Sequence, residues 1–241
     1  MIHIFTWLWK QEQAKVVYTA DHVNIWAAMI RRNITVPHRL SCVTDMPEGI
    51  DPSINIIPLP DFPHVSNKHW KSKDGKPQCY RRLDMFRRDA AGTYGDRFMS
   101  MDLDVCILGN IDKVVSLEGD LIINKSTVEK RAYNGALVLM NAGARPQVYE
   151  KFEPRLAEVA SGMYLGSDQA WYAYVLGWCE KRFGPEHGVC SYAKPNPTFG
   201  KPGNDCRMVF FPGSIKPWHI HKHGIEKIYR NYQLEPLECQ P

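Results

Sequence analysis

Apolar segments of β-strand length alternate along the chain with segments of helical periodicity. Residues 2–9 are apolar and aromatic, which predicts a buried strand. From about Asp21 to Arg32, apolar positions recur at helical spacing, and Asp21 is expected to cap that helix. Further strands are predicted at 39–44, 54–57, 97–101, 119–123, 135–140 and 207–211, and helices at 80–86, 146–160 and 167–177. This alternation predicts an α/β fold with a mostly parallel central sheet and helices on both faces.

Two long loops interrupt this pattern, at 59–78 and at 194–204, and both are rich in proline and glycine. Loops longer than about 12–15 residues are usually functional or disordered. The chain has no internal repeat, and no linker divides it. We therefore expect a single domain over residues 1–241.

The composition is that of a folded protein: 44% of the 241 residues are hydrophobic and 23% are charged. A net charge of +4 is too small to make nucleic acid the default partner. Residues 66–88 are nevertheless basic, with eight Lys and Arg against two Asp. They form either a solvated basic face or a contact to an anion, for which Arg81 and Arg82 are the better candidates.

Nothing in the sequence indicates export. No apolar run reaches the roughly 18 residues of a transmembrane helix, and the N-terminus lacks the features of a signal peptide. The seven cysteines are scattered, odd in number and without a C-x-x-C pair. This usage argues against a disulfide framework or a thiolate zinc site and favours a reducing, cytoplasmic location.

The most informative motif follows the apolar segment Phe98–Met101, where the chain continues as Asp102-Leu103-Asp104. On an extended backbone, residues i and i+2 project to the same side, so both carboxylates can converge on one ion. Two carboxylates suit Mg²⁺ or Mn²⁺, with water and phosphate oxygens completing the shell. Alone, so short a motif is a weak signal.

Combined with three later segments, this motif resembles the GT-A glycosyltransferases, especially glycosyltransferase family 8 and related bacterial and phage enzymes. Similar motifs in the same order are Cys79–Leu83, the D-x-D, Tyr133–Asn141, Gly166–Trp171 and the G-x-x-K-P-W of Gly213–Trp218. The resemblance covers roughly residues 79–218, and the ordered combination is more specific than any single motif.

The resemblance implies a GT-A, Rossmann-like fold and a metal-dependent glycosyltransferase. Such an enzyme moves a sugar from a nucleotide-sugar donor, here expected to be a UDP-hexose, to a hydroxyl acceptor. The implied cofactor is Mn²⁺ or Mg²⁺, and the implied stereochemical outcome is retention. Since no carboxylate can be named as a nucleophile, we favour a front-face route in which the leaving phosphate oxygen takes the acceptor proton.

The resemblance also assigns residues to roles. Donor-binding positions are Thr6, Trp7, Arg82, Asp102, Asn134 and Lys216, and catalytic positions are Asp168, Gln169 and Lys216. Structural interpretations remain open for several of them. Asn134 is also typical of a turn, Asp168 and Gln169 of a helix start after Ser167, and Trp7 of a core.

One position departs from the family pattern. The related enzymes have a third metal ligand, a histidine three residues before the glycine of G-x-x-K-P-W, and this chain has Phe210 there. We expect His219 to replace it, with His221 as the alternative. If neither binds, the ion is held by Asp102, Asp104, phosphate and water, which suits Mg²⁺.

Three alternatives agree with parts of the sequence. A haloacid-dehalogenase-type phosphatase also uses D-x-D, but it needs Thr or Val at the position of Cys106, and no downstream lysine with an acidic pair stands out. A non-catalytic protein that binds nucleotide sugars or glycans remains open. Within the enzyme class, the expected acceptor is a glycan or a lipid-linked saccharide, and modified DNA is the alternative that the basic segment encourages.

Overall fold

A computed structural model of the chain describes residues 1–10, 16–62, 78–193, 197–201, 203, 205–221 and 224–234. Four lysines of the predicted basic segment lie outside the described residues, so the two interpretations of that segment stay predictions: Lys68, Lys71, Lys73 and Lys76.

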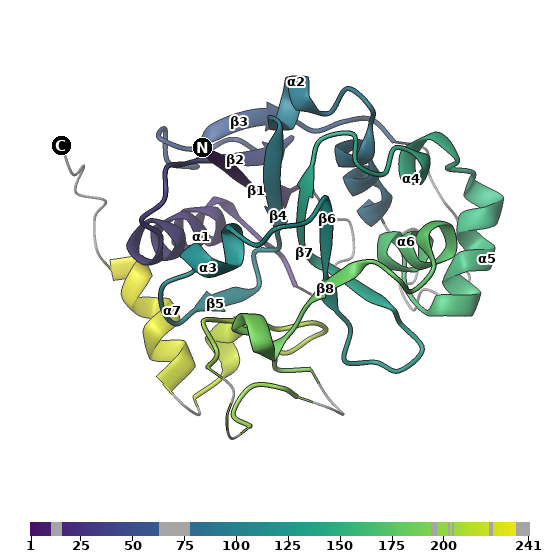
Figure 1. The fold of residues 1–241 in the computed structure, drawn as a ribbon. Coiled ribbons are helices and arrows are strands. Elements are labelled where there is room, and N and C mark those ends of the chain that lie inside the picture. The colour runs from purple at the N-terminus through teal and green to yellow at the C-terminus, as the bar shows by residue number, and fades with distance from the viewer. Residues whose placement is uncertain are drawn as a thin grey trace.

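The secondary structure follows the predicted alternation along the chain (Figure 1). The strands are β1 (Ile2–Leu8), β2 (His38–Thr44), β3 (Asn55–Pro58), β4 (Arg97–Met101), β5 (Val105–Ile107), β6 (Leu121–Lys125), β7 (Tyr133–Asn141), β8 (Lys181–Phe183), β9 (Val189–Ser191) and β10 (Met208–Phe210). The α-helices are α1 (Ala20–Asn33), α2 (Ala91–Tyr94), α3 (Asp112–Val115), α4 (Gln147–Glu150), α5 (Pro154–Tyr164), α6 (Asp168–Leu176) and α7 (Ile225–Leu234). The 3₁₀ helices are η1 (Gln78–Phe86), η2 (Pro185–His187) and η3 (Pro217–His219).

Within the described residues, seven strands form the central sheet in the order β3-β2-β1-β4-β7-β6-β8. Every neighbouring pair is parallel except the two that involve β7. The ends of β1, β4, β6 and β8 therefore meet at one edge of the sheet, where β7 begins. The predicted α/β fold with a mostly parallel sheet is confirmed.

Strand β1 shows how the sheet is covered on both faces. Ile4 and Leu8 belong to the same buried cluster as the apolar side of α1. Phe5 and Trp7 point the other way and pack in a second cluster with η1, α4, α5 and α6. Because side chains alternate along a strand, a strand buried on both faces is mostly apolar, as residues 2–9 are apart from His3 and Thr6. In Figure 1, α1 lies on one side of the sheet, and α4, α5 and α6 lie on the other.

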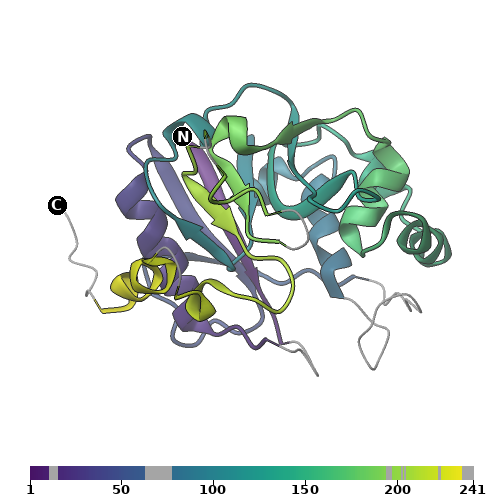
Figure 2. The same cartoon turned by 90° about the horizontal axis from the view of Figure 1, so that it is seen from below.

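A smaller sheet in the order β5-β10-β9 lies below the central one in Figure 1. β10 is antiparallel to β5 and parallel to β9. Side chains of these strands pack with Ile220 and with Ile225 at the start of α7. The sheet places β5, which directly follows the D-x-D, next to the strand that leads to Lys216 (Figure 2).

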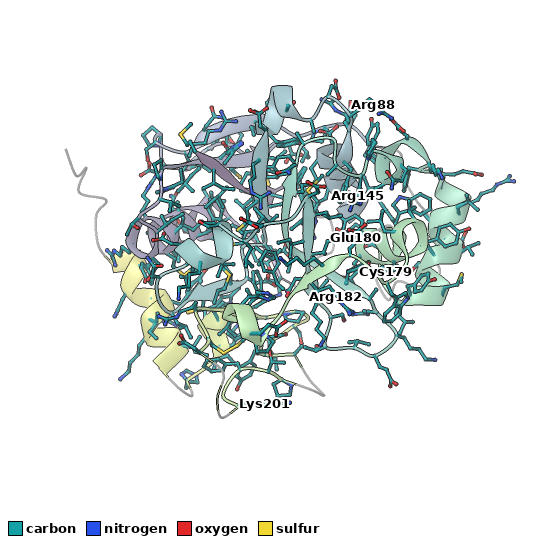
Figure 3. The ribbon with its side chains drawn as sticks, viewed as in Figure 1. Arg88, Arg145, Cys179, Glu180, Arg182 and Lys201 are labelled. Carbon is teal, nitrogen blue, oxygen red and sulfur yellow. A yellow bond between two sulfur atoms is a disulfide. The ribbon has the colours of Figure 1, made fainter. Side chains whose placement is uncertain are left out.

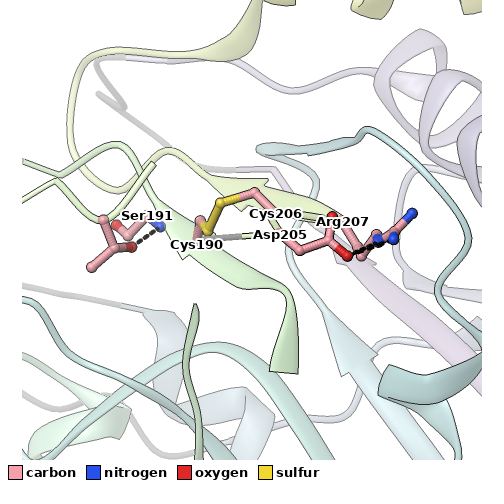
Figure 4. The surroundings of a disulfide bond; sticks show 6 residues. Cys190, Ser191, Asp205, Cys206 and Arg207 are labelled. Carbon is pink, nitrogen blue, oxygen red and sulfur yellow. Dashed lines mark hydrogen bonds and ion pairs between the residues drawn. A yellow bond between two sulfur atoms is a disulfide. The ribbon is translucent and has the colours of Figure 1, made fainter. Parts of the chain in front are cut away.

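The sequence argues against a disulfide framework, but the structure contains a disulfide. Cys190 and Cys206 are joined, linking β9 to the segment that precedes β10 (Figure 4). The odd cysteine count argued against a framework of several bridges, but it could not exclude a single bridge that the fold creates. Of the remaining cysteines among the described residues, Cys42 and Cys106 are buried thiols, and burial raises the pKa of each to about 12.

Two local predictions are also corrected. The segment at 80–86 is a 3₁₀ helix, η1, instead of an α-helix. α1 begins after Thr19, so Asp21 lies within its first turn and is not the cap. The backbone N–H of Thr19 donates to Nδ1 of His22 over 3.1 Å.

Among the described helices, none has the length and apolar character to span a bilayer.

Candidate active site

A pocket of about 140 Å³ opens at the edge where β1 and β4 end. Ligands of open α/β sheets bind at this edge, outside the carboxyl ends of the strands. Its walls are Trp7, Leu8, Trp9, Tyr18, Arg82 and the D-x-D segment Asp102-Leu103-Asp104. Both aspartates therefore border the same space, as the spacing on the sequence predicted.

Asp102 follows the last residue of β4, and its backbone N–H donates to the carbonyl of Ala136 over 2.8 Å. Its carboxylate pairs with Arg82, whose Nη1 lies 2.6 Å from Oδ1. Burial raises the pKa of Asp102 to about 6, with Arg82 acting in the opposite direction and Asp104 adding to the rise. The arginine thus keeps in place a carboxylate that burial and a neighbouring charge disfavour.

Arg82 also connects this carboxylate to the next element. Nη1 donates to the carbonyl of Gly135 over 3.1 Å, and Nε lies 3.4 Å from Oδ2 of Asp168. Burial lowers the pKa of Arg82, but the charges of Asp102 and Asp168 outweigh it and raise the pKa well above its ordinary value. Arg82 is therefore a fixed cation between two acids from different parts of the chain.

The second aspartate has its own cation. Lys216 is buried, with 4% of its surface exposed, and its ammonium forms an ion pair with Oδ2 of Asp104. The same nitrogen donates to the carbonyl of Phe211 over 3.1 Å. Because an ammonium carries three donors, one proton remains beyond these two contacts. The K-P-W motif thus reaches the D-x-D directly.

Tyr18 completes the surroundings of Asp104, and sequence reasoning missed it. Its hydroxyl donates to Oδ2 of Asp104 over 3.2 Å, and its ring centroid lies 5.8 Å from the Lys216 nitrogen. Burial and then the charge of Asp104 raise the pKa of Tyr18, so the phenol stays protonated. Tyr18 lies in an aperiodic segment between β1 and α1, where no spacing or motif marks it.

Asp168 and Gln169 open α6 and meet the start of β7. Asp168 is 3% exposed and accepts hydrogen bonds from Ser167 over 3.1 Å and from Tyr172 over 3.4 Å. The side-chain oxygen of Gln169 lies 3.5 Å from the backbone nitrogen of Gly135, which donates to it. A Cβ on Gly135 would lie 2.9 Å from Oδ2 of Asp168, so the site requires glycine there.

Asn134 makes the contact that the turn interpretation expects. Its Oδ1 accepts from the backbone N–H of Ala136 over 2.9 Å. In the sheet, Asn134 pairs with Asn124 of β6, beside the bulge between Ile123 and Asn124. Asn134 therefore shapes the start of β7, next to Gly135 and Arg82.

The residues predicted to hold the nucleotide differ in position. Trp7 lines the pocket while its indole N–H donates to Oγ of Ser100 over 2.9 Å. Thr6 is fully buried and does not line the pocket. Trp9, which the motifs did not single out, is a wall of the pocket instead.

No described residue adds a third ligand to the two aspartates. Within the described residues, no group of three or more His, Cys, Asp and Glu side chains could hold an ion. His219 is exposed in η3 with its ring against Trp218, and His221 pairs with Glu226. Phe210, at the position of the family histidine, is buried in β10.

The two aspartates nevertheless fit a divalent cation. Arg82 binds Oδ1 of Asp102, whereas Lys216 and Tyr18 bind Oδ2 of Asp104. No described residue hydrogen-bonds to Oδ2 of Asp102 or to Oδ1 of Asp104. Paired carboxylate oxygens with open coordination positions are the donor set that Mg²⁺ and Mn²⁺ favour.

Comparison with solved structures identifies the fold as that of the GT-A glycosyltransferases. The chain is similar to the galactosyltransferase LgtC in complex with donor and acceptor sugar analogues, with a TM-score of 0.60 and 14% identity over 97% of this chain and 95% of LgtC. An active-site mutant of LgtC, glutamine to glutamate, gives 0.60 at 13% identity over 95% of this chain and 94% of that one.

The bifunctional glycosyltransferase WbbM, in its apo form, gives a TM-score of 0.62 at 11% identity. That match covers 98% of this chain and 50% of WbbM. No protein-family model matches the chain, and no curated protein matches it. Structural matches at identities this low establish the fold alone, so the function has to be argued from the site.

Proposed function

We propose that the chain is a metal-dependent glycosyltransferase that moves a hexose from a UDP-sugar to a hydroxyl acceptor. The observation that carries this proposal is the pairing of each D-x-D aspartate with a buried cation at one pocket: Asp102 with Arg82, and Asp104 with Lys216. The fold, shared with solved glycosyltransferases, supports it.

The charge balance of the site suits a diphosphate together with a divalent cation. Three carboxylates, those of Asp102, Asp104 and Asp168, meet two cations, Arg82 and Lys216, which leaves one net negative charge. Bound alone, a diphosphate would be repelled by that charge. A divalent cation on the two D-x-D carboxylates reverses the sign and would neutralise the leaving pyrophosphate oxygens.

Lys216 and Arg82 are suited to bind the donor. The third ammonium proton of Lys216 is free to donate to a phosphate oxygen. Arg82 binds Asp102 and the carbonyl of Gly135 through Nη1, and its side chain borders the pocket. Preorganised donors at the point where charge develops are commonly a large contribution to catalysis.

We assign Asp168 and Gln169 to the transferred sugar and the acceptor hydroxyl, with Asn134 beside them. Their support is proximity: Arg82 joins Asp168 to the D-x-D, and Gln169 and Asn134 contact the first residues of β7. Trp7 would contact the nucleotide. For Thr6 and His219, the geometry offers no support for a ligand contact.

We further propose retention by a front-face route. The acceptor oxygen forms a bond to the anomeric carbon as the bond from that carbon to the phosphate oxygen breaks, and the acceptor proton passes to that phosphate oxygen. The step balances without a nucleophilic carboxylate. Asp168, the nearest acid outside the D-x-D, is held by Arg82, Ser167 and Tyr172.

The test is hydrolysis of the donor. Purified protein is incubated with UDP-glucose and UDP-galactose, with Mn²⁺ and with EDTA, and UDP release is measured. We expect release that depends on Mn²⁺, is lost in Asp102→Asn and persists in Asp89→Asn, an exposed aspartate away from the pocket. Binding of UDP with Mn²⁺ but no turnover with any acceptor would instead identify a non-catalytic binder.

Two finer predictions accompany this function. The expected acceptor is a glycan or another hydroxyl compound, since no feature of the described residues favours modified DNA. A cytoplasmic location stays a prediction, and the Cys190–Cys206 disulfide weakens one argument for it, because disulfides are rare in the cytosol.

A further inference from the structure

A second pocket, of about 290 Å³, lies where β6 and β8 end. Its volume is about twice that of the pocket at the D-x-D. The polar side chains that line it include Lys125, Ser126, Thr127, Ser191, Thr198 and Lys201. We call it the lysine pocket. Figure 3 shows Lys201 at the lower edge of the molecule, away from the Arg145–Glu180 ion pair.

The lysine pocket and the D-x-D lie at the same edge of the central sheet, on either side of the start of β7. On one side, the backbone of Asp102 donates to Ala136 of β7. On the other, Asn124, a buried wall of the lysine pocket, pairs with Asn134 of β7. Two strand spacings therefore separate the two strands that carry these walls, about 10 Å.

The chemistry of the lysine pocket is that of an anion site. Neither the Lys125 nor the Lys201 side chain forms an ion pair or hydrogen bond with any described residue. The hydroxyl oxygens of Ser126 and Ser191 each accept a backbone hydrogen bond, from Val128 over 3.1 Å and from Ala193 over 3.2 Å. A hydroxyl that accepts keeps its proton to donate, so the polar lining offers donors.

No carboxylate is among the described residues of the lining. The acids nearby have other partners. Glu186, whose carboxylate lies close to Gly184, pairs with His187, and Asp205 pairs with Arg207. The lining itself thus carries two positive charges and no described negative one.

The wall that carries Ser191 is held rigidly. The backbone N–H of Ser191 donates to Oγ1 of Thr198 over 2.8 Å, and the neighbouring Cys190 is bonded to Cys206 (Figure 4). Ser191 itself is buried, with 6% of its surface exposed. A pocket with fixed polar walls has the features of a ligand site.

We propose that the lysine pocket binds an anionic group, a phosphate or a carboxylate, on the acceptor saccharide. The inference rests on the proposed function and names the acceptor class for it. The acceptor would extend from the D-x-D pocket past the start of β7, with its reacting hydroxyl near Asp168 and its anionic group between Lys125 and Lys201.

The experiment measures sugar binding by calorimetry with glucose, glucose 6-phosphate and glucuronate as probes. We expect wild type to bind one or both anionic sugars at least ten-fold more tightly than glucose, and the stronger of the two identifies the anion. In the double variant Lys125→Gln/Lys201→Gln this preference should fall to about two-fold or less, since each lost charge-assisted hydrogen bond costs about ten-fold or more in affinity. Lys130→Gln, an exposed lysine outside the lining, should keep the preference.

Equal affinity of wild type for the three sugars overturns the inference, as does a preference that survives in the double variant. Circular dichroism of each variant confirms that it folds. Donor hydrolysis by wild type with Mn²⁺ is measured separately. A wild type that hydrolyses donor but shows no anion preference refutes the acceptor class alone, whereas one that does not hydrolyse donor refutes the proposed function.

Discussion

The hydroxyl of Tyr18 donates a hydrogen bond to Oδ2 of Asp104 over 3.2 Å, joining the segment before α1 to the D-x-D. The same carboxylate oxygen receives the Lys216 ammonium. Two donors on Oδ2 fix the rotamer of Asp104 and leave Oδ1 available to other ligands. Since burial and Asp104 both raise the pKa of Tyr18, the phenol remains a donor at any working pH.

Tyr18→Phe should therefore slow the enzyme while leaving the ring in place. A hydrogen bond to a charged group contributes about 1.5–3 kcal/mol, so kcat/KM for Mn²⁺-dependent donor hydrolysis should fall about ten-fold. Tyr149→Phe, on a partly buried tyrosine packed with the other cluster, is the matched control. An unchanged kcat/KM in Tyr18→Phe would show that the hydrogen bond does not position Asp104.

The Asp104–Lys216 pair makes a prediction about stability. Removing one partner of a buried ion pair leaves an uncompensated charge, so Lys216→Met should lower the unfolding free energy by about 3 kcal/mol. Adding Asp104→Leu removes the second charge as well, and the double variant should recover most of that loss. Urea unfolding followed by tryptophan fluorescence measures both values. Additive losses in the double variant would mean that the two charges are not coupled.

Gly135 predicts a sharp steric effect. Gly135→Ala places a Cβ 2.9 Å from Oδ2 of Asp168 and so pushes that carboxylate away from Arg82. Losing this charge-assisted contact should cost ten-fold or more in kcat/KM for donor hydrolysis. Gly92→Ala is the control, because a Cβ there meets nothing within 4 Å. Equal activity in both variants would exclude a role for the Arg82–Asp168 contact.

His3 predicts how stability depends on pH. Burial lowers its pKa from 6.5 to about 4, opposed by the hydrogen bond to Tyr94. Nδ1 lies 2.7 Å from the Tyr94 carbonyl oxygen and 3.1 Å from Nη2 of Arg39, whose charge lowers the pKa further, and Nε2 lies 2.6 Å from Oγ of Ser41. The unfolded chain therefore binds a proton below pH 6.5 that the folded protein takes up only near pH 4.

As pH falls from 6.5 to 4, this group should lower the unfolding free energy by up to about 3 kcal/mol. The measurement is urea unfolding at intervals of half a pH unit. His3→Gln should flatten this part of the curve, and His38→Gln should leave it as in wild type. If wild type and His3→Gln show the same slope between pH 6.5 and 4, the ring is not held neutral.

Most of the central sheet could be predicted because its strands are long enough to show a pattern. β1, β4 and β7 are mostly apolar segments of seven, five and nine residues, long enough for the sequence pattern to show, and the D-x-D follows the end of β4. β5, β8 and β9 have three residues each, too few to show a period, and tertiary pairing creates them. The order of the G-x-x-K-P-W motif and the D-x-D in the sequence does not show the ion pair between Lys216 and Asp104, which the fold creates.

The remainder of the site depends on distance in space. Tyr18 is far from Asp104 in sequence and belongs to no motif, so only the packing of α1 and η3 against the sheet brings it there. His219, the histidine that directly follows Trp218, is exposed at the end of η3, a position that the sequence alone does not show. The Cys190–Cys206 bond could not be read from seven scattered cysteines, since spacing does not determine connectivity.

That bond has a practical side for anyone handling the protein. It closes the end of the smaller sheet over a sequence separation of 16, and one of its sulfur atoms belongs to a residue that lines the lysine pocket. Protein prepared with dithiothreitol would therefore differ from protein prepared without it in the covalent structure beside the lysine pocket. Acceptor screens run only in reducing buffer would sample the looser one.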